Sequence, residues 1–402
     1  MKIGILRETK TPPDKRVPLT PVQCRELIEK YPGIEIQVQP DDNRAYSNKE
    51  YRVEKIPLND KLSDCDLLLG VKEVDISSLI ANKTYLFFSH TAKKQAHNHD
   101  LLKAILTKKI TLIDYEYLTK DDNTRIVAFG RWAGIVGAYN ALIAYGKRYH
   151  QFELKPAWEC KDLAQLFGEL NKVKISNIKI LITGGGRVAH GAMETLSNAG
   201  IKKINPDKFT SRQYNTAVFT QLDPWHYTKP MDGRKFDLNH FFTFPEEYEN
   251  AFLPYTRITD MLIACHYWDP RSPVFMTKED MKQEDFRIKI IADVSCDING
   301  PIPSTLRAST IEDPVYGYDP INEVEADPWA PGNILVMAVD NLPGELPRDA
   351  SNDFGRKLID EVMPYLLGIK KGNILDHATI VKQGKLTDKF VYLKDFAEGK
   401  GR

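Results

Sequence analysis

Residues 179–200 read KILITGGGRVAHGAMETLSNAG, and this stretch decides the fold. An apolar run, KILIT, ends at three consecutive glycines, and AMETLSNAG can continue a helix directly after them. Residues Gly184 to Ala189 match G-x-G-x-x-G/A, the turn that leads from a strand into a helix in dinucleotide-binding proteins. Gly184 would permit the tight turn, and Gly186 would let a pyrophosphate approach the backbone. The context therefore predicts nucleotide binding, with a merely structural turn as the alternative.

The residue that would select the cofactor is missing from its usual place. A unit that binds NAD normally carries an acidic residue about 20 positions further on, at the end of the second strand, to hold the ribose 2′-hydroxyl. Here that region reads IKKINPDKFTSR, in which Asp207 is a possible substitute. Alternatively, Lys203, Lys208 or Arg212 could receive the 2′-phosphate of NADP. The residues leave the choice between NAD and NADP open.

Apolar runs alternate with helix-like stretches on both sides of this turn. Before it come MKIGIL, PVQCRELIEKY, IEIQVQ, CDLLLGVK, TYLFFS, NHDLLKAILTKK and ITLIDYEYL; after it come MLIACHYW, IKIIADVS and ILVMAVDNLP. Alternation at this spacing predicts βαβ units and mostly parallel sheets. We therefore expect an α/β protein with two Rossmann-like domains and a cleft between them.

Domain boundaries follow from the same pattern. The apolar stretch 130–150 predicts a long helix that could link two domains. The end of the chain, SNDFGRKLIDEVMPYLLGI, predicts an amphipathic helix with Ser351 or Asn352 as its N-cap, packed back on the first domain. The expected domains are 1–129 plus 345–402 for substrate and catalysis, and 130–344 for the dinucleotide, with an insertion at about 206–257.

Composition excludes several classes of protein. Lys+Arg and Asp+Glu both number 55, which argues against a nucleic-acid binder because such proteins normally carry a basic excess. No stretch approaches the roughly 20 apolar residues of a membrane span, and the N-terminus lacks a signal-peptide core. Five scattered cysteines without a CxxC pair suggest reduced thiols and no metal site. We expect a cytoplasmic protein with small-molecule partners that could form an oligomer.

Two candidate proton carriers stand where apolar runs end. Lys72 ends CDLLLGVK, and His90 follows TYLFFS. If these runs are parallel strands of one sheet, both side chains emerge at its carboxyl edge, where open α/β proteins bind ligands. A histidine titrates near pH 6.5 unperturbed, and a lysine beside another cation or in an apolar pocket titrates below its usual range. The alternative for Lys72 is a solvated charge.

Other charged residues lie near further strand ends. Arg16 could clamp a substrate carboxylate through its two parallel N–H groups. Glu116 and Arg125 lie at or near further strand ends, and Asp340 ends ILVMAVD. For Arg16, Glu116 and Arg125 the alternative is an ordinary surface charge, and for Asp340 it is a turn or N-cap carboxylate.

Taken together, the ordered segments resemble a known family. The segments are ETKTPPDKRVPLTP, LLLGVKEV, TYLFFSHTAKKQ, LIDYEYL, RIVAFGRWAGIVG, GGGRVAHG and VDNLPGELPRDAS. They resemble the L-lysine-forming saccharopine dehydrogenases, which include the lysine–ketoglutarate reductase half of the bifunctional lysine-degrading enzyme. The resemblance covers nearly the whole chain. It implies an oxidoreductase that interconverts saccharopine with lysine and 2-oxoglutarate, using a nicotinamide cofactor (NAD or NADP).

The resemblance also assigns roles to residues. It implies that Lys72 and His90 are the acid–base pair. Around the carboxylates and amines of the substrate it places Arg16, Glu73, Glu116 and Arg125, and at the cofactor it places Gly184, Gly186, Arg187, Val188, Asp340 and Leu342.

Alanine dehydrogenase is the alternative, because it shares the architecture and the pattern of Arg, Lys and His. The segments AFGRWAG and Asp340-Asn341-Leu342-Pro343 differ from their counterparts in that family and favour saccharopine. A regulator that binds a nucleotide without turnover is a further alternative, against which the retained Lys72, His90 and Arg16 argue.

Overall fold

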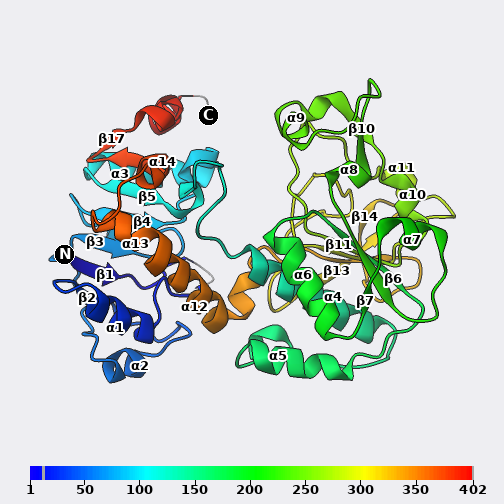
Figure 1. Ribbon diagram of the computed structural model, residues 1–402, viewed down its shortest axis with the longest axis horizontal. Coiled ribbons are helices and arrows are strands. Elements are labelled where there is room, and N and C mark those ends of the chain that lie inside the picture. The colour runs from blue at the N-terminus through cyan, green and yellow to red at the C-terminus, as the bar shows by residue number, and fades with distance from the viewer. Residues whose placement is uncertain (11–13, 401–402) are drawn as a thin grey trace. The chain divides into compact units, whose positions relative to one another are not determined.

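The computed structural model describes residues 1–10 and 14–400, and the chain divides into two compact units (Figure 1). Unit 1 comprises Met1–Phe129 and Pro347–Arg402, and unit 2 comprises Gly130–Leu346. Both are α/β, so the expected fold class is confirmed, with mostly parallel sheets in each. In the described residues, no helix combines the length and the apolarity needed to cross a bilayer.

The described part of unit 1 is built on a seven-stranded sheet of order β17-β16-β5-β4-β3-β1-β2. The parallel strands are β1 (Lys2–Ile5), β2 (Glu35–Val38), β3 (Leu67–Leu69), β4 (Thr84–Phe87) and β5 (Thr111–Asp114). Two antiparallel strands, β16 (Thr379–Lys382) and β17 (Lys385–Leu386), extend the sheet beyond β5. The accompanying helices are α1 (Pro21–Lys30), α2 (Asn48–Val53), α3 (His99–Thr107), α12 (Pro347–Lys357), α13 (Met363–Leu366), α14 (Ile374–Ala378) and α15 (Lys394–Ala397).

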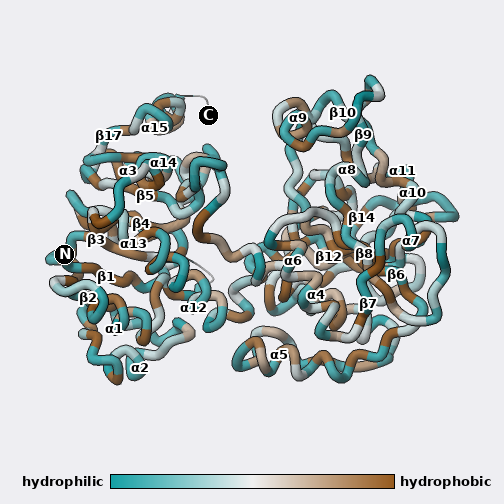
Figure 2. The backbone as a smooth tube through the Cα atoms, viewed as in Figure 1, coloured by the Kyte–Doolittle hydropathy of each residue, from teal (hydrophilic) through white to brown (hydrophobic). Residues whose placement is uncertain are grey.

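The central strands of unit 1, β1, β3 and β4, are largely buried on both faces, as expected of a parallel sheet covered on both sides. All three residues of β3 are buried, and the apolar strands appear brown in Figure 2. An aromatic cluster joins distant parts of the chain, because Phe129 stacks on Phe354 with ring centroids 4.7 Å apart. Phe88, directly after β4, contacts both rings at 6.1 Å. The C-terminal segment, which contains Phe354, thus packs through aromatic contacts against the core of unit 1.

Helix α12 begins four positions before the predicted N-cap residue Ser351, so that N-cap prediction was wrong. The helix starts at Pro347, whose fixed φ suits a first helical position. The Ser351 hydroxyl instead donates to the Pro347 carbonyl at 2.6 Å and accepts the Val17 N–H at 2.9 Å. A side chain that looks like a cap in the sequence is therefore used in a tertiary contact.

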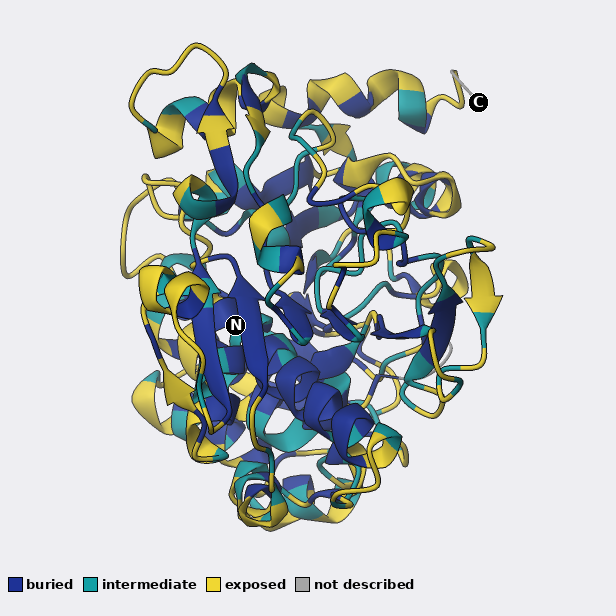
Figure 3. Cartoon of the chain, turned by 90° about the vertical axis from the view of Figure 1, so that its right-hand side faces the viewer, coloured by how far each residue is buried: buried dark blue, intermediate teal, exposed yellow. Residues whose placement is uncertain are grey.

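The described part of unit 2 has an eight-stranded sheet of order β14-β13-β15-β12-β11-β6-β8-β7. Its parallel strands are β6 (Lys179–Thr183), β7 (Lys202–Lys203), β8 (Val218–Leu222), β11 (Met261–Ala264), β12 (Ile290–Asp293) and β15 (Ile334–Met337). Strands β13 (Val315–Asp319) and β14 (Val324–Ala326) are antiparallel. The helices are α4 (Gly130–Arg148), α5 (Leu163–Glu169), α6 (Arg187–Asn198), α7 (Pro206–Ser211), α8 (Pro224–Tyr227), α9 (Leu238–Thr243), α10 (Leu253–Thr256) and α11 (Lys278–Met281). The central strands and much of α4 are buried, as the dark blue in Figure 3 shows.

The segment 206–257, for which the sequence predicts an insertion, contributes a central strand. Strand β8 pairs with β6 along its whole length, so the expectation of an insertion does not hold for Val218–Leu222. Outside the sheet stands a small hairpin of β9 (Thr228–Pro230) and β10 (Tyr248–Asn250), which carries α9 between its strands. The sequence pattern did not reveal β8 because an additional short strand and helix, β7 and α7, separate this strand from the glycine turn.

Helices α4 and α6 pack so closely that they require glycine. A Cβ atom on Gly191 would lie 2.0 Å from the Arg131 carbonyl oxygen, and one on Gly134 would lie 1.8 Å from that of Val188. Because both obstacles are backbone atoms, no change of side-chain rotamer can relieve them. These glycines hold α6, the helix that follows the glycine turn, against the longest helix of the unit.

Substituting Gly191 with Ala is therefore expected to destabilise the protein by about 3 kcal/mol or more, since overpacking alone costs about 1–3 kcal/mol. Gly168 in α5 is the matched control, because nothing lies within 4 Å of a Cβ placed there. Gly168→Ala should be neutral or stabilising by about 0.5–1 kcal/mol. Urea unfolding of both variants measures the effects, and equal stabilities would contradict the packing described.

Candidate active site

Lys72 and His90 follow two neighbouring strands. Strands β3 and β4 are parallel, with Leu69 paired to Leu86, so their carboxyl ends lie at the same edge of the sheet. This arrangement of strands confirms the condition from which the sequence-based argument started. His90 has a left-handed backbone conformation, with φ of 51°, directly before a short 3-10 turn.

Glu73 links the two strand ends. Its Oε1 atom lies 2.5 Å from His90 Nδ1, and its other oxygen lies 3.6 Å from Lys10 Nζ. Burial opposes ionisation of Glu73, but the hydrogen bond and charge of His90 outweigh it and lower the pKa of the carboxyl to about 2. The carboxylate therefore orients the imidazole and fixes which ring nitrogen faces away from it.

This lowered pKa predicts a contribution to stability that is lost in acid. The folded-state pKa lies below the ordinary value of 4.5, so the contribution is present above pH 4.5 and disappears as pH falls toward 2. From pH 6 to pH 3, wild type should lose about 2 kcal/mol more unfolding free energy than Glu73→Gln. Urea titrations at both pH values measure this, with the exposed Glu153→Gln as control. Parallel losses in all three proteins would contradict the role of Glu73.

Lys72 sits beside other charged groups. Burial, followed by the charge of Arg16, lowers its pKa, while Asp14 and Glu73 act in the opposite direction. Arg16 is buried, with its guanidinium 4.2 Å from the centre of the Phe129 ring. Its Nε donates to Asp14 Oδ1 at 2.9 Å. A lysine with a lowered pKa next to a fixed cation suits proton transfer.

Glu8 is a member of this cluster that the sequence reasoning missed. Its two carboxylate oxygens accept the backbone N–H groups of Val71 and Lys72 at 2.7 and 2.8 Å. Burial, followed by the charge of Asp14, raises its pKa to about 8. Glu8 therefore fixes the backbone from which the Lys72 side chain leaves β3. Its only signal in the sequence was its place in the segment ETKTPPDKRVPLTP, of which residues 11–13 lie outside the described residues.

A second group of charges follows β5. Glu116 Oε1 lies 2.7 Å from Arg125 Nη2 and 3.2 Å from Lys93 Nζ. Burial opposes ionisation of Glu116, but Lys93 and Arg125, with a smaller effect of His90, lower its pKa. Asp114 ties the ends of β4 and β5 together, because it accepts the Ser89 hydroxyl at 2.6 Å. The structure thus brings Glu116 and Arg125 together and adds Lys93 to them.

Unused acceptors face this group of residues. Glu73 Oε2 and Glu116 Oε2 are buried and have no hydrogen-bond partner in the described part of the chain. Buried acceptors normally find donors, so these oxygens are suited to the N–H groups of an amine or ammonium ligand. Arg16, Lys72 and Arg125 supply cations for carboxylates in the same unit. The set can therefore bind a molecule that carries both kinds of group.

In unit 2 the glycine turn has the geometry that a dinucleotide needs. Gly184 has φ of +89°, and a Cβ there would lie 2.7 Å from the Cys265 carbonyl oxygen. In contrast, nothing lies within 4 Å of a Cβ placed on Gly186, the residue that caps α6. The first turn of this helix has no side-chain cap. Open space beside a helix N-terminus that has no side-chain cap fits a pyrophosphate, so these residues could hold a dinucleotide.

Asp223 is a second residue that sequence reasoning missed. The strand beside β6 is β8, and Asp223 follows it directly. A Cβ on Gly185 would lie only 2.2 Å from Asp223 Oδ1, so the carboxylate adjoins the glycine turn. Asp207, the substitute considered from the sequence, lies on α7 after the edge strand β7. The acidic residue is displaced along the chain because β7 and α7 intervene.

The remaining predicted cofactor residues lie around these elements of unit 2. Arg187 and Val188 open α6, and Arg187 is exposed. Asp340 is exposed in the turn after β15, whereas Leu342 is 1% exposed and packs toward Gly137 of α4. Any contact of Leu342 with a cofactor would therefore involve its backbone. In the described residues there is no cluster of His, Cys, Asp or Glu that could hold a metal ion.

Comparison with known proteins gives a consistent picture. Residues 4–136 match the family described as alanine dehydrogenase/PNT, N-terminal domain. The chain is 27% identical to saccharopine dehydrogenase (NAD(+), L-lysine-forming) of Emericella nidulans, over 92% of each chain. It is 29% identical to the alpha-aminoadipic semialdehyde synthase of Arabidopsis thaliana over 97% of its own length, but spans only 41% of that protein. These similarities confirm the resemblance found in the sequence.

Among solved structures, an L-alanine dehydrogenase aligns with a TM-score of 0.62 over 99% of both chains, at 14% identity. This similarity shows a shared fold. The chain also spans less than half the length of the other semialdehyde synthases that it matches, at 48% of the protein from Mus musculus.

Proposed function

We propose that this chain, a member of the alanine dehydrogenase-like superfamily, is an NAD-dependent, L-lysine-forming saccharopine dehydrogenase. It would convert saccharopine, NAD⁺ and water reversibly to lysine, 2-oxoglutarate, NADH and a proton. The observation that carries the proposal is the convergence in unit 1 of Lys72, His90 and Glu73 with Arg16. This set combines proton carriers with groups that pair with both carboxylates and amines, as saccharopine requires.

The proposed mechanism assigns each residue a separate task. Arg16 and Arg125 hold carboxylates of the substrate and fix its orientation. Lys72, whose pKa is lowered, takes the proton from the secondary amine of saccharopine before hydride leaves its carbon. The glycine turn of unit 2 would hold the nicotinamide cofactor, which would supply a hydride acceptor in the oxidative direction and a hydride donor in the other.

Hydrolysis of the resulting substrate imine needs a second proton carrier. His90, oriented by Glu73, takes a proton from the attacking water and later delivers one to the departing lysine nitrogen. Glu73 Oε2 and Glu116 Oε2, which make no hydrogen bond within the described part of the chain, accept N–H groups of the substrate. In the reverse direction, proton transfers through His90 and Lys72 expel water from the adduct of lysine and 2-oxoglutarate.

The choice of NAD rests on Asp223. A carboxylate directly after β8, which pairs with β6, would accept the ribose 2′-hydroxyl of NAD and repel the 2′-phosphate of NADP. The residues Lys203, Lys208 and Arg212 belong to the β7 and α7 region, on the far side of β8 from the glycine turn. This arrangement supports NAD over NADP.

The test is a direct assay. Purified protein mixed with saccharopine and NAD should show rising absorbance of NADH, together with stoichiometric lysine and 2-oxoglutarate. A second candidate, alanine dehydrogenation, is tested in parallel because residues 4–136 match the alanine dehydrogenase/PNT N-terminal domain. Turnover of alanine to pyruvate without turnover of saccharopine would overturn the proposal, and NADH binding without turnover of either would indicate a regulator.

A further inference from the structure

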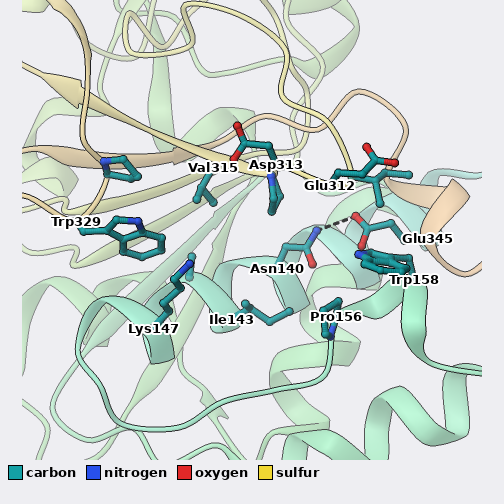
Figure 4. A pocket seen from close by; sticks show the side chains of 14 residues that line it. Asn140, Ile143, Lys147, Pro156, Trp158, Glu312, Asp313, Val315, Trp329 and Glu345 are labelled. Carbon is teal, nitrogen blue, oxygen red and sulfur yellow. Dashed lines mark hydrogen bonds between the residues drawn. The ribbon is translucent and has the colours of Figure 1, made fainter. Parts of the chain in front are cut away.

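Unit 2 contains a cavity that no part of the proposed reaction uses. Its volume is about 290 Å³, at the lower end of the range of small-molecule sites. It lies between α4, the segment around Trp158, the loop 311–314 with the start of β13, and Trp329 (Figure 4). None of its lining residues belongs to the glycine turn or to the end of β8 at Asp223.

The walls of the cavity are largely apolar and aromatic. Ile143 and Val315 contribute aliphatic surface, and Trp158 and Trp329 lie at its two ends in Figure 4. The Trp329 ring already holds a cation, because Lys147 Nζ lies 4.4 Å from its centroid. Trp158 is about half exposed and Trp329 is about one-third exposed, so the surfaces of both side chains are accessible to a ligand.

Three carboxyl groups line the same space. Glu345 is 2% exposed and accepts the Asn140 side-chain amide at 2.8 Å, as the dashed line in Figure 4 shows. Glu312 and Asp313 line the cavity as well, and their side chains have no hydrogen bond or ion pair with any described residue. Burial, followed by the charge of Glu312, raises the pKa of Glu345 to about 8.

This combination selects one class of ligand. An anion would be repelled by Glu312 and Asp313, and an apolar molecule would leave their oxygens unpaired. The single cation of the lining, Lys147, is engaged with Trp329. We propose that this cavity binds a small organic ammonium compound with an apolar body, its nitrogen between Glu345 and Glu312 and its body between the indole rings. The proposal is independent of the proposed reaction.

Binding of a cation should be coupled to proton release. At pH 7 a carboxyl with a pKa of about 8 is mostly protonated, and an adjacent ammonium stabilises its ionised form. Asn140 and Tyr139 of α4 and Glu312 of the loop before β13 are the groups that interact with Glu345, and Lys147 and Asp313 line the same cavity. Because none of these is a histidine, the proton released near neutral pH comes from Glu345.

Isothermal titration calorimetry of the full chain with 2-phenylethylammonium tests the proposal. We expect a Kd of about 1 mM or lower and at least a tenfold weaker affinity for the neutral 2-phenylethanol. Titrations at pH 7 in Tris and in phosphate should differ in apparent enthalpy by an amount that corresponds to nearly one proton released.

Two variants complete the test. Glu345→Gln keeps an acceptor for Asn140 but removes the charge, and it should weaken ammonium binding at least tenfold and abolish the buffer dependence. The exposed Glu284→Gln, in the same unit but outside the cavity, should bind as wild type does. Three results would each overturn the proposal: equal affinity for the alcohol, absence of binding, or unchanged binding by Glu345→Gln. A thermal midpoint of Glu345→Gln that matches wild type shows that the variant is folded.

Discussion

Replacing Lys72 by Met is expected to lower kcat for saccharopine oxidation by about 10²- to 10⁴-fold, the usual contribution of a positioned proton carrier. The Met side chain has similar length and apolar character but cannot take the proton from the substrate amine. Because the glycine turn, and not Lys72, would hold the pyrophosphate of the cofactor, the Kd for NADH should change by less than about twofold. Fluorescence titration of NADH and steady-state kinetics measure the two effects separately.

The pH profile distinguishes this role from a structural one. Oxidation requires the neutral amine, so the rate for wild type should rise with pH through the pKa of Lys72, which lies below the ordinary 10.5. In Lys72→Met this limb should disappear. Lys103→Met, an exposed substitution on α3, should keep both the rate and the limb. An unchanged profile in Lys72→Met would assign the proton transfer to another group.

Replacing Asp223 by Ser is expected to raise the KM for NAD by about 10- to 100-fold, since a hydrogen bond to a charged group is worth about 1.5–3 kcal/mol. The same change should lower the KM for NADP, because the negative charge that repels the 2′-phosphate is gone. The ratio of kcat/KM for NAD to that for NADP should therefore fall at least about tenfold, while kcat with saturating NAD stays close to wild type.

Asp207→Ser is the matched control for this experiment. Asp207 is the acidic residue that stands near the expected position in the sequence, but it lies on α7 beyond the edge strand. Its substitution should leave both KM values unchanged. A loss of NAD preference in Asp207→Ser rather than in Asp223→Ser would show that the cofactor approaches the edge strand instead of β8.

Elements whose signals are local were predicted well from the sequence. The strand, glycines and helix of residues 179–200 lie where the pattern puts them, as β6 and α6. The long helix predicted over 130–150 is α4, and the apolar runs before Lys72 and His90 are parallel neighbours. Each of these signals spans only a few residues, because backbone hydrogen bonding and side-chain periodicity act over one or two turns. The catalytic roles of the two strand ends stay predictions until the assays are done.

Only the tertiary structure decided which distant residues meet. It placed β8 rather than the segment near Asp207 beside β6, and so brought Asp223 to the glycine turn. It also paired Glu73 with His90 and assigned Ser351 to a contact with Val17 instead of a cap. Strand order depends on loop closure and on the burial of complete faces, which no short pattern encodes. The sequence by itself thus determined the α/β repeat and the strand ends that carry charge, and tertiary packing determined the partners of those charges.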